Sequence, residues 1–193
     1  MTTVPSRPPQ PASQVDAEAP FSPALARVLP GPLGAMVAVA DASALLALWF
    51  VGDDDPGVLR ERLARRLGRG IELGESAILA RAHEALAAYF AGDLRALDAR
   101  DLPLDPPGTR FQQRVWAELR RIPAGQTRSY ADLACALDKP TATRAVAAAN
   151  ADNPIAIFVP CHRVIGRDGT LTGYAGSLWR KEWLLKHEGS RLV

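Results

Sequence analysis

The chain has 193 residues, 48% of them hydrophobic, and its 23 Lys/Arg and 21 Asp/Glu leave a formal net charge of +2. This length suits one large domain or two small ones, and the composition is that of an ordinary soluble protein. The only cysteines are Cys135 and Cys161, which excludes a disulfide framework. We therefore expect free thiols, a reducing compartment and a cytoplasmic protein.

The charge is divided unevenly along the chain. Residues 107–193 carry 13 Lys/Arg against 7 Asp/Glu, whereas residues 1–106 carry 10 against 14. A basic half beside an acidic half favours a polyanionic partner for the C-terminal half. Uneven surface charge without a function is the alternative interpretation.

Residues 1–20 are rich in proline and contain no apolar stretch, so we expect a disordered tail rather than a secretory signal. Residues 36–51 are apolar but interrupted and too short to span a bilayer, and no membrane contact is expected.

Residues 21–105 follow as a small α+β module. Met36–Ala40 and Ala44–Val51 have the pattern of two strands joined by a turn, and Val58–Leu67 and Ile78–Phe90 that of amphipathic helices. The prolines between 103 and 107 indicate a linker. This half offers no catalytic constellation.

The C-terminal half, residues 106–193, begins with short helices and sharp stops. Thr109 can cap a helix through Leu119, Ser129 a helix from Tyr130 to Leu137, and Thr141 a helix from Ala142 to about Ala151. A helix, a turn and a small-residue helix carrying arginine are typical of a helix-turn-helix. Alanines after Arg144 cannot read base edges, which favours sequence-independent binding.

The next segment carries the candidate nucleophile. Ile155–Val159 is apolar and is expected to form a strand that ends at Pro160-Cys161-His162. Residues 167–170 predict a hairpin turn, and Ser177 is expected to cap a last helix. A lone cysteine is usually a small buried hydrophobe, but a base beside it can convert the thiol to the nucleophilic thiolate.

These residues resemble a known family. Pro160-Cys161-His162-Arg163-Val164-Ile165-Gly166 is similar to the active-site signature of the O6-methylguanine-DNA methyltransferases. The similarity continues in order through Phe111-Gln112, Ile122-Pro123-Ala124-Gly125, Arg144-Ala145-Val146, Gly173-Tyr174-Ala175-Gly176 and Lys181-Glu182-Trp183-Leu184-Leu185. It is dense over residues 108–189 and thin over residues 30–100.

The resemblance implies a fold and a reaction. A ribonuclease-H-like α+β domain at 21–105 would precede a winged helix-turn-helix domain at 106–193 that carries the active site. The protein would flip an alkylated guanine out of double-stranded DNA, with O4-alkylthymine as a second candidate substrate. The alkyl group would then pass irreversibly to Cys161. No cofactor is implied. Because no cysteine precedes Cys135, the zinc site of some relatives is not expected, and we predict no metal.

The resemblance also implies roles for single residues. His162 would be the base for Cys161, acting through a water because neighbours on an extended chain face opposite ways, and Glu188 would orient the imidazole. Asn153, a hinge before Pro154, joins the catalytic group with Tyr130 and Lys181. The guanine would be bound by four residues: Tyr174, Val164, Ala175 and Gly176.

Arg144 is implied as the wedge that replaces the flipped base from the minor groove. Further DNA contacts are expected at Ser129, Tyr130, Thr141, Ala142 and Ala145. Asn150 and Ala156 should lie near the pocket, where a small Ala156 leaves room for larger alkyl groups. We expect a monomer.

Two alternatives stay open. A non-catalytic lesion-binding protein would lack the acceptor thiol, whereas Cys161 is present. A winged-helix regulator would need base-reading side chains on helix 142–151, and it leaves Glu188 and Tyr174 without a role.

Overall fold

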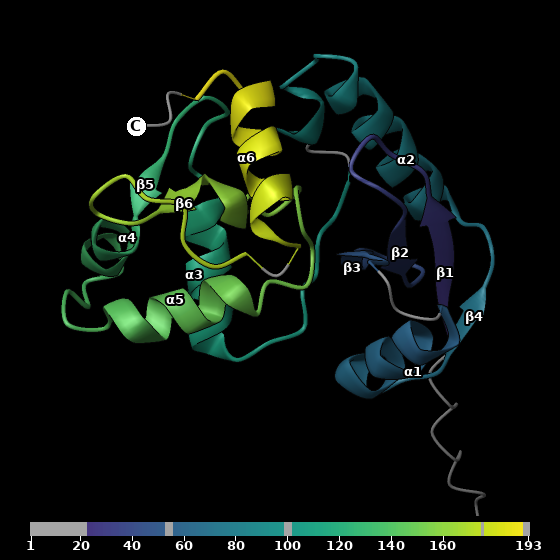
Figure 1. The fold of residues 1–193 in the computed structure, drawn as a ribbon. Coiled ribbons are helices and arrows are strands. Elements are labelled where there is room, and N and C mark those ends of the chain that lie inside the picture. The colour runs from purple at the N-terminus through teal and green to yellow at the C-terminus, as the bar shows by residue number, and fades with distance from the viewer. Residues whose placement is uncertain (1–22, 53–55, 99–101, 175, 191–193) are drawn as a thin grey trace, which may run out of the picture.

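The computed structural model describes residues 23–52, 56–98, 102–174 and 176–190 (Figure 1). The expected tail at 1–20 and the expected pocket residue Ala175 lie outside these ranges. The described chain has mixed α and β structure, with a sheet and two helices from the N-terminal half beside a helical C-terminal half.

A four-stranded sheet organises the N-terminal half. Its strands are β1 (Ala24–Leu29), β2 (Met36–Ala40), β3 (Leu45–Phe50) and β4 (Ile71–Leu73), in the order β3-β2-β1-β4. The expected pair β2 and β3 is confirmed as antiparallel neighbours. β1 and the parallel β4 were not predicted, because one lies beside a proline-rich tail and the other has only three residues.

One helix covers each face of this sheet. α2 (Ala77–Phe90) packs Leu79, Leu86 and Tyr89 against the face that carries Met36 and Ala38. α1 (Pro56–Leu67) packs Leu59 and Leu63 against the face that carries Val37 and Val39. β2 is therefore buried on both faces, and alternate residues along it enter two separate cores.

The segment after α2 pairs with the sheet, and the buried residues of the two halves are in contact with one another. A 3-10 turn, η1 (Ala96–Asp98), leads to residues 103–105, which pair with the start of β3. The Leu45 amide donates to the Pro103 carbonyl at 2.9 Å, and the Asp105 amide donates to the Leu45 carbonyl at 3.0 Å. Buried residues of α2, β3 and the C-terminal helices then form one continuous cluster.

Two of the C-terminal helices begin at side-chain caps, and a third does not. α3 (Arg110–Leu119) and α4 (Tyr130–Ala136) start with capping boxes at Thr109 and Ser129, as predicted. α5 (Thr143–Ala151) does not start as predicted, because Ala142 is its N-cap and no side chain caps it. Thr141 lies in the preceding turn and is exposed.

The expected strand at Ile155–Val159 is wrong. These residues form a compact turn in which the Val159 amide donates to the Ile155 carbonyl at 3.0 Å. Ile157 has φ of 71°, which an extended strand cannot accommodate. Only Ile155 pairs with the sheet, through a bridge to Leu48. An apolar run cannot distinguish a buried strand from a buried turn, and this one is a turn.

The cysteine segment also departs from an extended chain. Cys161–Arg163 forms a 3-10 turn, η2, followed by β6 (Val164–Ile165), which pairs in parallel with β5 (Arg128–Ser129). The turn expected at 167–170 is present, because the Gly166 amide donates to the Thr170 carbonyl. Within the described ranges no strand returns from it to pair with β6, so it closes no hairpin.

α6 (Leu178–His187) ends the described chain. Ser177 is its N-cap residue as predicted, but its side chain caps nothing. Its φ of 79° turns the chain into the helix from a left-handed conformation, so it acts as a backbone corner instead.

Candidate active site

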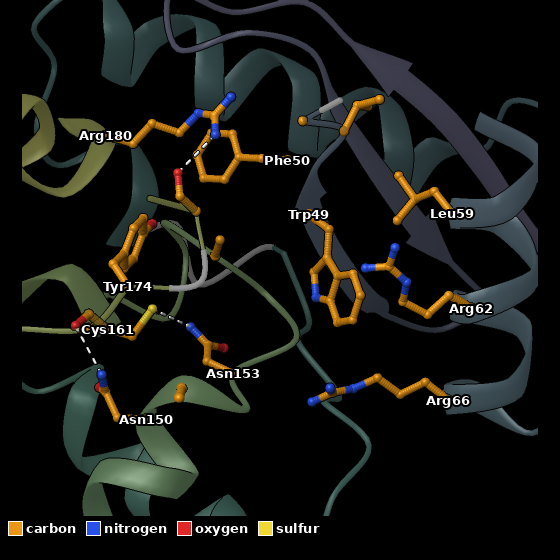
Figure 2. A pocket seen from close by; sticks show the side chains of 16 residues that line it. Trp49, Phe50, Leu59, Arg62, Arg66, Asn150, Asn153, Cys161, Tyr174 and Arg180 are labelled. Atoms are coloured by element: carbon orange, nitrogen blue, oxygen red, sulfur yellow. Dashed lines mark hydrogen bonds between the residues drawn. The ribbon is translucent and has the colours of Figure 1, made fainter. Parts of the chain in front are cut away.

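A cavity of about 350 Å³ lies between the N-terminal sheet and the C-terminal half (Figure 2). One wall is built from the end of β3 and from α1, and the other from Cys161, the end of α5 and the loop before α6. Its lining includes Trp49, Phe50, Leu59, Arg62, Arg66, Asn150, Asn153, Ala156, Cys161, Gly173, Tyr174, Gly176 and Arg180. The predicted neighbours Asn150 and Ala156 do line it.

Cys161 is held at the cavity wall by its preceding turn. Its side chain is 6% exposed, and Asn153 Nδ2 donates to Sγ at 3.0 Å. The same amide nitrogen donates to the Val159 carbonyl at 2.7 Å. The β3 edge anchors the start of the turn, since the Leu48 amide donates to the Pro154 carbonyl at 2.8 Å. Asn153 is therefore a buried brace rather than the hinge to a strand.

The resting state of Cys161 is a thiol. Burial raises the pKa of Cys161, although the Asn153 hydrogen bond and the charge of Lys181 oppose this. Cys135, in contrast, is exposed. A base is therefore needed to remove the proton from Cys161 when it reacts.

His162 is buried and paired with Glu188. The distance from His162 Nε2 to Glu188 Oε1 is 3.0 Å, and burial keeps the pKa of His162 below its usual value. An ionised carboxylate only accepts hydrogen bonds, so Nε2 carries the hydrogen. Nδ1 is left as the acceptor, and it has no partner among the described residues. The tautomer thus leaves a lone pair on Nδ1 that can accept a proton.

Glu188 receives three further hydrogen bonds that sequence reasoning missed. Arg163 donates through Nε to Oε2 at 2.9 Å and through Nη2 to Oε1 at 2.8 Å. Tyr89 of α2 donates its hydroxyl to Oε1 at 2.8 Å. Burial alone would raise the pKa of Glu188, but the hydrogen bonds and charges of His162 and Arg163 outweigh it and lower the pKa to about 2.

Lys181 is a structural cation behind the site. It is fully buried, and Nζ donates to the Val164 carbonyl at 2.6 Å and to the Thr172 carbonyl at 2.7 Å. Burial lowers the pKa of Lys181 to about 8, and Cys161 opposes this shift. The Val164 carbonyl, expected to face the guanine, therefore already accepts one hydrogen bond.

The expected base-binding loop is packed against the N-terminal half. Arg180 Nη1 donates to the Gly176 carbonyl at 2.8 Å, and its guanidinium lies 4.7 Å from the Phe50 ring centroid. A β-carbon on Gly176 would lie 2.7 Å from Tyr174 and 2.8 Å from Phe50, so no larger residue fits there. Phe50 and Arg180 were missed, since neither belongs to a recognisable motif.

Two residues that line this cavity, Tyr174 and Asn150, carry buried polar atoms without partners among the described residues. The hydroxyl of Tyr174 is buried, and in the described structure it lacks a hydrogen-bond partner, as do Asn150 Oδ1 and His162 Nδ1. Asn150 Nδ2 donates to the Cys161 carbonyl at 3.4 Å. Buried polar atoms without partners are rare in folded proteins, so a polar ligand or water is expected to satisfy them.

The expected DNA-contacting residues lie along α4 and α5. Arg144 and Ala145 are exposed on the first turns of α5, and Ala142 and Tyr130 are half-buried. Ser129 is engaged in its capping box, where Oγ and Asp132 Oδ2 lie 2.8 Å apart. Trp116 fixes α5 to α3 by donating from Nε1 to the Ala149 carbonyl at 2.8 Å.

No helix among the described residues has the length and apolarity to cross a bilayer. No cluster of three His, Cys, Asp or Glu side chains in the same ranges could hold a metal ion.

Residues 110–190 match the family model described as 6-O-methylguanine DNA methyltransferase, DNA binding domain. Over 110 residues the chain is 58% identical to a methylated-DNA–protein-cysteine methyltransferase of Salmonella typhimurium, covering 57% of this chain but only 63% of that relative. A Methanosarcina acetivorans protein of the same name is 55% identical over 109 residues, covering 56% of this chain and 68% of that protein.

The similarity to solved structures covers more of the chain. The structure described as Mycobacterium tuberculosis OGT in complex with DNA is 41% identical, with a TM-score of 0.71. The match covers 86% of this chain and 92% of that one. It therefore extends into the N-terminal half, where the resemblance read from the sequence was thin.

Proposed function

The chain belongs to the O6-methylguanine-DNA methyltransferase family, and from this we propose that it is a direct-reversal DNA repair enzyme. It transfers the alkyl group of O6-alkylguanine in double-stranded DNA to its own Cys161, and O4-alkylthymine is the second candidate substrate. The observation that carries this proposal is the buried series Cys161, His162 and Glu188 at a cavity lined by unpaired polar atoms.

The transfer is a displacement at the alkyl carbon. The thiol proton of Cys161 passes through a water to Nδ1 of His162, whose Nε2 donates to Glu188. The sulfur–carbon bond forms as the bond from carbon to O6 breaks. Guanine leaves with that electron pair and takes up one proton, which balances the one lost by the thiol.

Placement of the base uses groups on the same wall of the pocket as Cys161. Tyr174 offers a buried hydroxyl without a protein partner in the described ranges, and the Cys161 and Val164 carbonyls are the proposed acceptors for the base. Lys181 holds the Val164 carbonyl in place. Its positive charge favours the thiolate that forms during transfer.

DNA docks on α4 and α5 through the minor groove. Arg144 fills the space of the flipped nucleotide, while Ser129, Tyr130, Thr141, Ala142 and Ala145 approach the backbone. We infer that α4 and α5 are the helix-turn-helix of a winged domain at 106–193. A ribonuclease-H-like domain at 21–105 precedes it, and the protein acts as a cytoplasmic monomer.

The acceptor is used once, because an alkyl thioether is not reduced as a disulfide is. A test uses DNA with a radiolabelled O6-methyl group. One label per protein molecule is expected, with none on Cys161→Ala and full labelling of Cys135→Ala. More than one methyl removed per molecule of protein would contradict a single-use acceptor.

The alternative is a non-catalytic lesion-binding or regulatory protein. It predicts DNA binding without labelling of any cysteine. The buried thiol, base and carboxylate have no purpose in that case, so we favour transfer.

A further inference from the structure

α1 is basic although it belongs to the acidic half of the chain. Its twelve residues carry four arginines against one glutamate, whereas residues 1–106 as a whole carry 10 Lys/Arg against 14 Asp/Glu. Arg62, Arg65 and Arg66 are spaced three and four residues apart, so they share one face of the helix. All three are exposed.

This arginine face lies at the active-site cavity. Arg62 and Arg66 line the same cavity as Cys161, on the wall opposite the sulfur (Figure 2). The guanidinium of Arg66 lies 5.1 Å from the Trp49 ring centroid. This cation–π contact favours an orientation of Arg66 towards the cavity.

The same face adjoins the helix that we propose to enter the groove. Arg66 donates to the backbone carbonyl of Asp152, the C-cap residue of α5. In Figure 1, α1 and α5 lie along the same lower side of the molecule. A duplex docked on α5 that delivers a nucleotide to Cys161 therefore has to pass close to α1.

We propose that the Arg62–Arg65–Arg66 face of α1 is a second DNA-binding surface, which contacts phosphates beside the extruded nucleotide. The inference rests on the proposed function, because it assumes that the cavity receives a flipped base. A nucleotide in the cavity keeps its two flanking phosphates, which remain at the mouth. Guanidinium groups bind phosphate through paired hydrogen bonds.

The test measures the salt dependence of binding to a short, unmodified duplex. Each phosphate contact contributes about 0.9 to the slope of log K against log salt. The double variant Arg62→Gln/Arg65→Gln should lower the slope by about 1.8 and weaken binding about 25-fold near physiological salt. Arg60→Gln is the matched control, because Arg60 is exposed on the other side of the same helix, and it should behave as wild type.

Two results would overturn the proposal. One is a slope for the double variant equal to that of wild type. The other is an equal loss of slope in Arg60→Gln, which would mean that only overall charge matters. Thermal unfolding of each variant accompanies the titration. Weaker binding with an unchanged slope and a lower unfolding midpoint also counts against the surface.

A separate measurement distinguishes failure of the α1 surface from failure of the proposed transfer reaction. Wild-type protein is incubated with the free base O6-benzylguanine, which needs no DNA contact. Benzylation of Cys161 together with an unchanged slope rejects only the α1 surface. Absence of benzylation, together with absence of label on Cys161 from the radiolabelled O6-methyl DNA, rejects the transfer reaction, whatever the slopes show.

Discussion

The hydroxyl of Tyr89 donates a 2.8 Å hydrogen bond to Oε1 of Glu188, although 99 positions separate the two residues. Tyr89 also accepts a hydrogen bond at its carbonyl from His187 Nε2 at 2.8 Å, and the two rings meet edge to face at 5.0 Å. α2 of the N-terminal half thus fixes the end of α6 through two hydrogen bonds and one ring contact. The carboxylate that orients His162 is therefore shared between the two halves.

Tyr89→Phe should slow alkyl transfer without weakening DNA binding. The ring stays in the core, and only the donor to Glu188 is lost, so His162 is held less firmly. Loss of a hydrogen bond to a charged group also lowers the free energy of unfolding by about 1.5–3 kcal/mol. Single-turnover kinetics, DNA titration and urea unfolding measure the three quantities. If the variant reacts as fast as wild type once DNA is saturating, Tyr89 would instead contribute to DNA binding.

Glu188 should make stability depend on acid pH. Its pKa in the folded protein is about 2 against an ordinary 4.5, so its stabilisation is complete above pH 4.5. That stabilisation is lost as the pH falls towards 2. The difference corresponds to about 3 kcal/mol. Urea unfolding between pH 6 and pH 2 should show a shallower decline in Glu188→Gln than in wild type. Parallel curves for the two proteins would reject the low pKa of Glu188.

Gly176→Ala should disturb the pocket. The added β-carbon would overlap Tyr174 and Phe50, and such overpacking costs about 1–3 kcal/mol. The midpoint of thermal unfolding and the rate of transfer from free O6-benzylguanine should both fall. Gly173→Ala is the matched control for stability, since a β-carbon there meets nothing within 4 Å. Equal destabilisation of the two variants would mean that loss of glycine, rather than the contact, is responsible.

Arg144→Ala should slow repair of duplex DNA far more than dealkylation of the free base. Arg144 is exposed on the first turn of α5, among side chains too small to fill a gap in stacked bases. Removing the wedge raises the cost of flipping by a few kcal/mol. Arg144→Lys should restore the rate only in part, because an ammonium group does not stack as a guanidinium does. An equal loss on both substrates would place Arg144 in the fold or the pocket.

Most helices and the main catalytic residues could be predicted from the sequence. The helix starts are predictable because a cap depends on residues only three positions apart. Thr109 and Ser129 cap helices because their partners Gln112 and Asp132 stand three residues away. Glu188 reaches His162 as expected. The turn at 155–159 was missed because an apolar run fits a buried strand as well as a buried turn, and an isoleucine with positive φ, such as Ile157, is rare.

The remaining site residues depend on tertiary contacts. Tyr89 and Phe50 reach the site from a helix and a strand of the other half, so no local sequence pattern predicts their role. Arg163 belongs to the active-site signature, but only the structure shows that it donates hydrogen bonds to both carboxylate oxygens of Glu188. Thr141 and Ser177 are residue types that cap helices, but the N-cap of α5 is Ala142, and Ser177 has a positive φ and makes no side-chain cap.

Peptide mass mapping after reaction tests the central claim most directly. Wild-type protein is incubated with duplex DNA carrying O6-methylguanine, digested and compared with protein exposed to unmodified DNA. We predict a gain of one CH₂ on the peptide containing Cys161, none on that containing exposed Cys135, and unmodified guanine in the DNA. Repaired DNA with an unmodified Cys161, or methylation of Cys135 instead, would contradict the account.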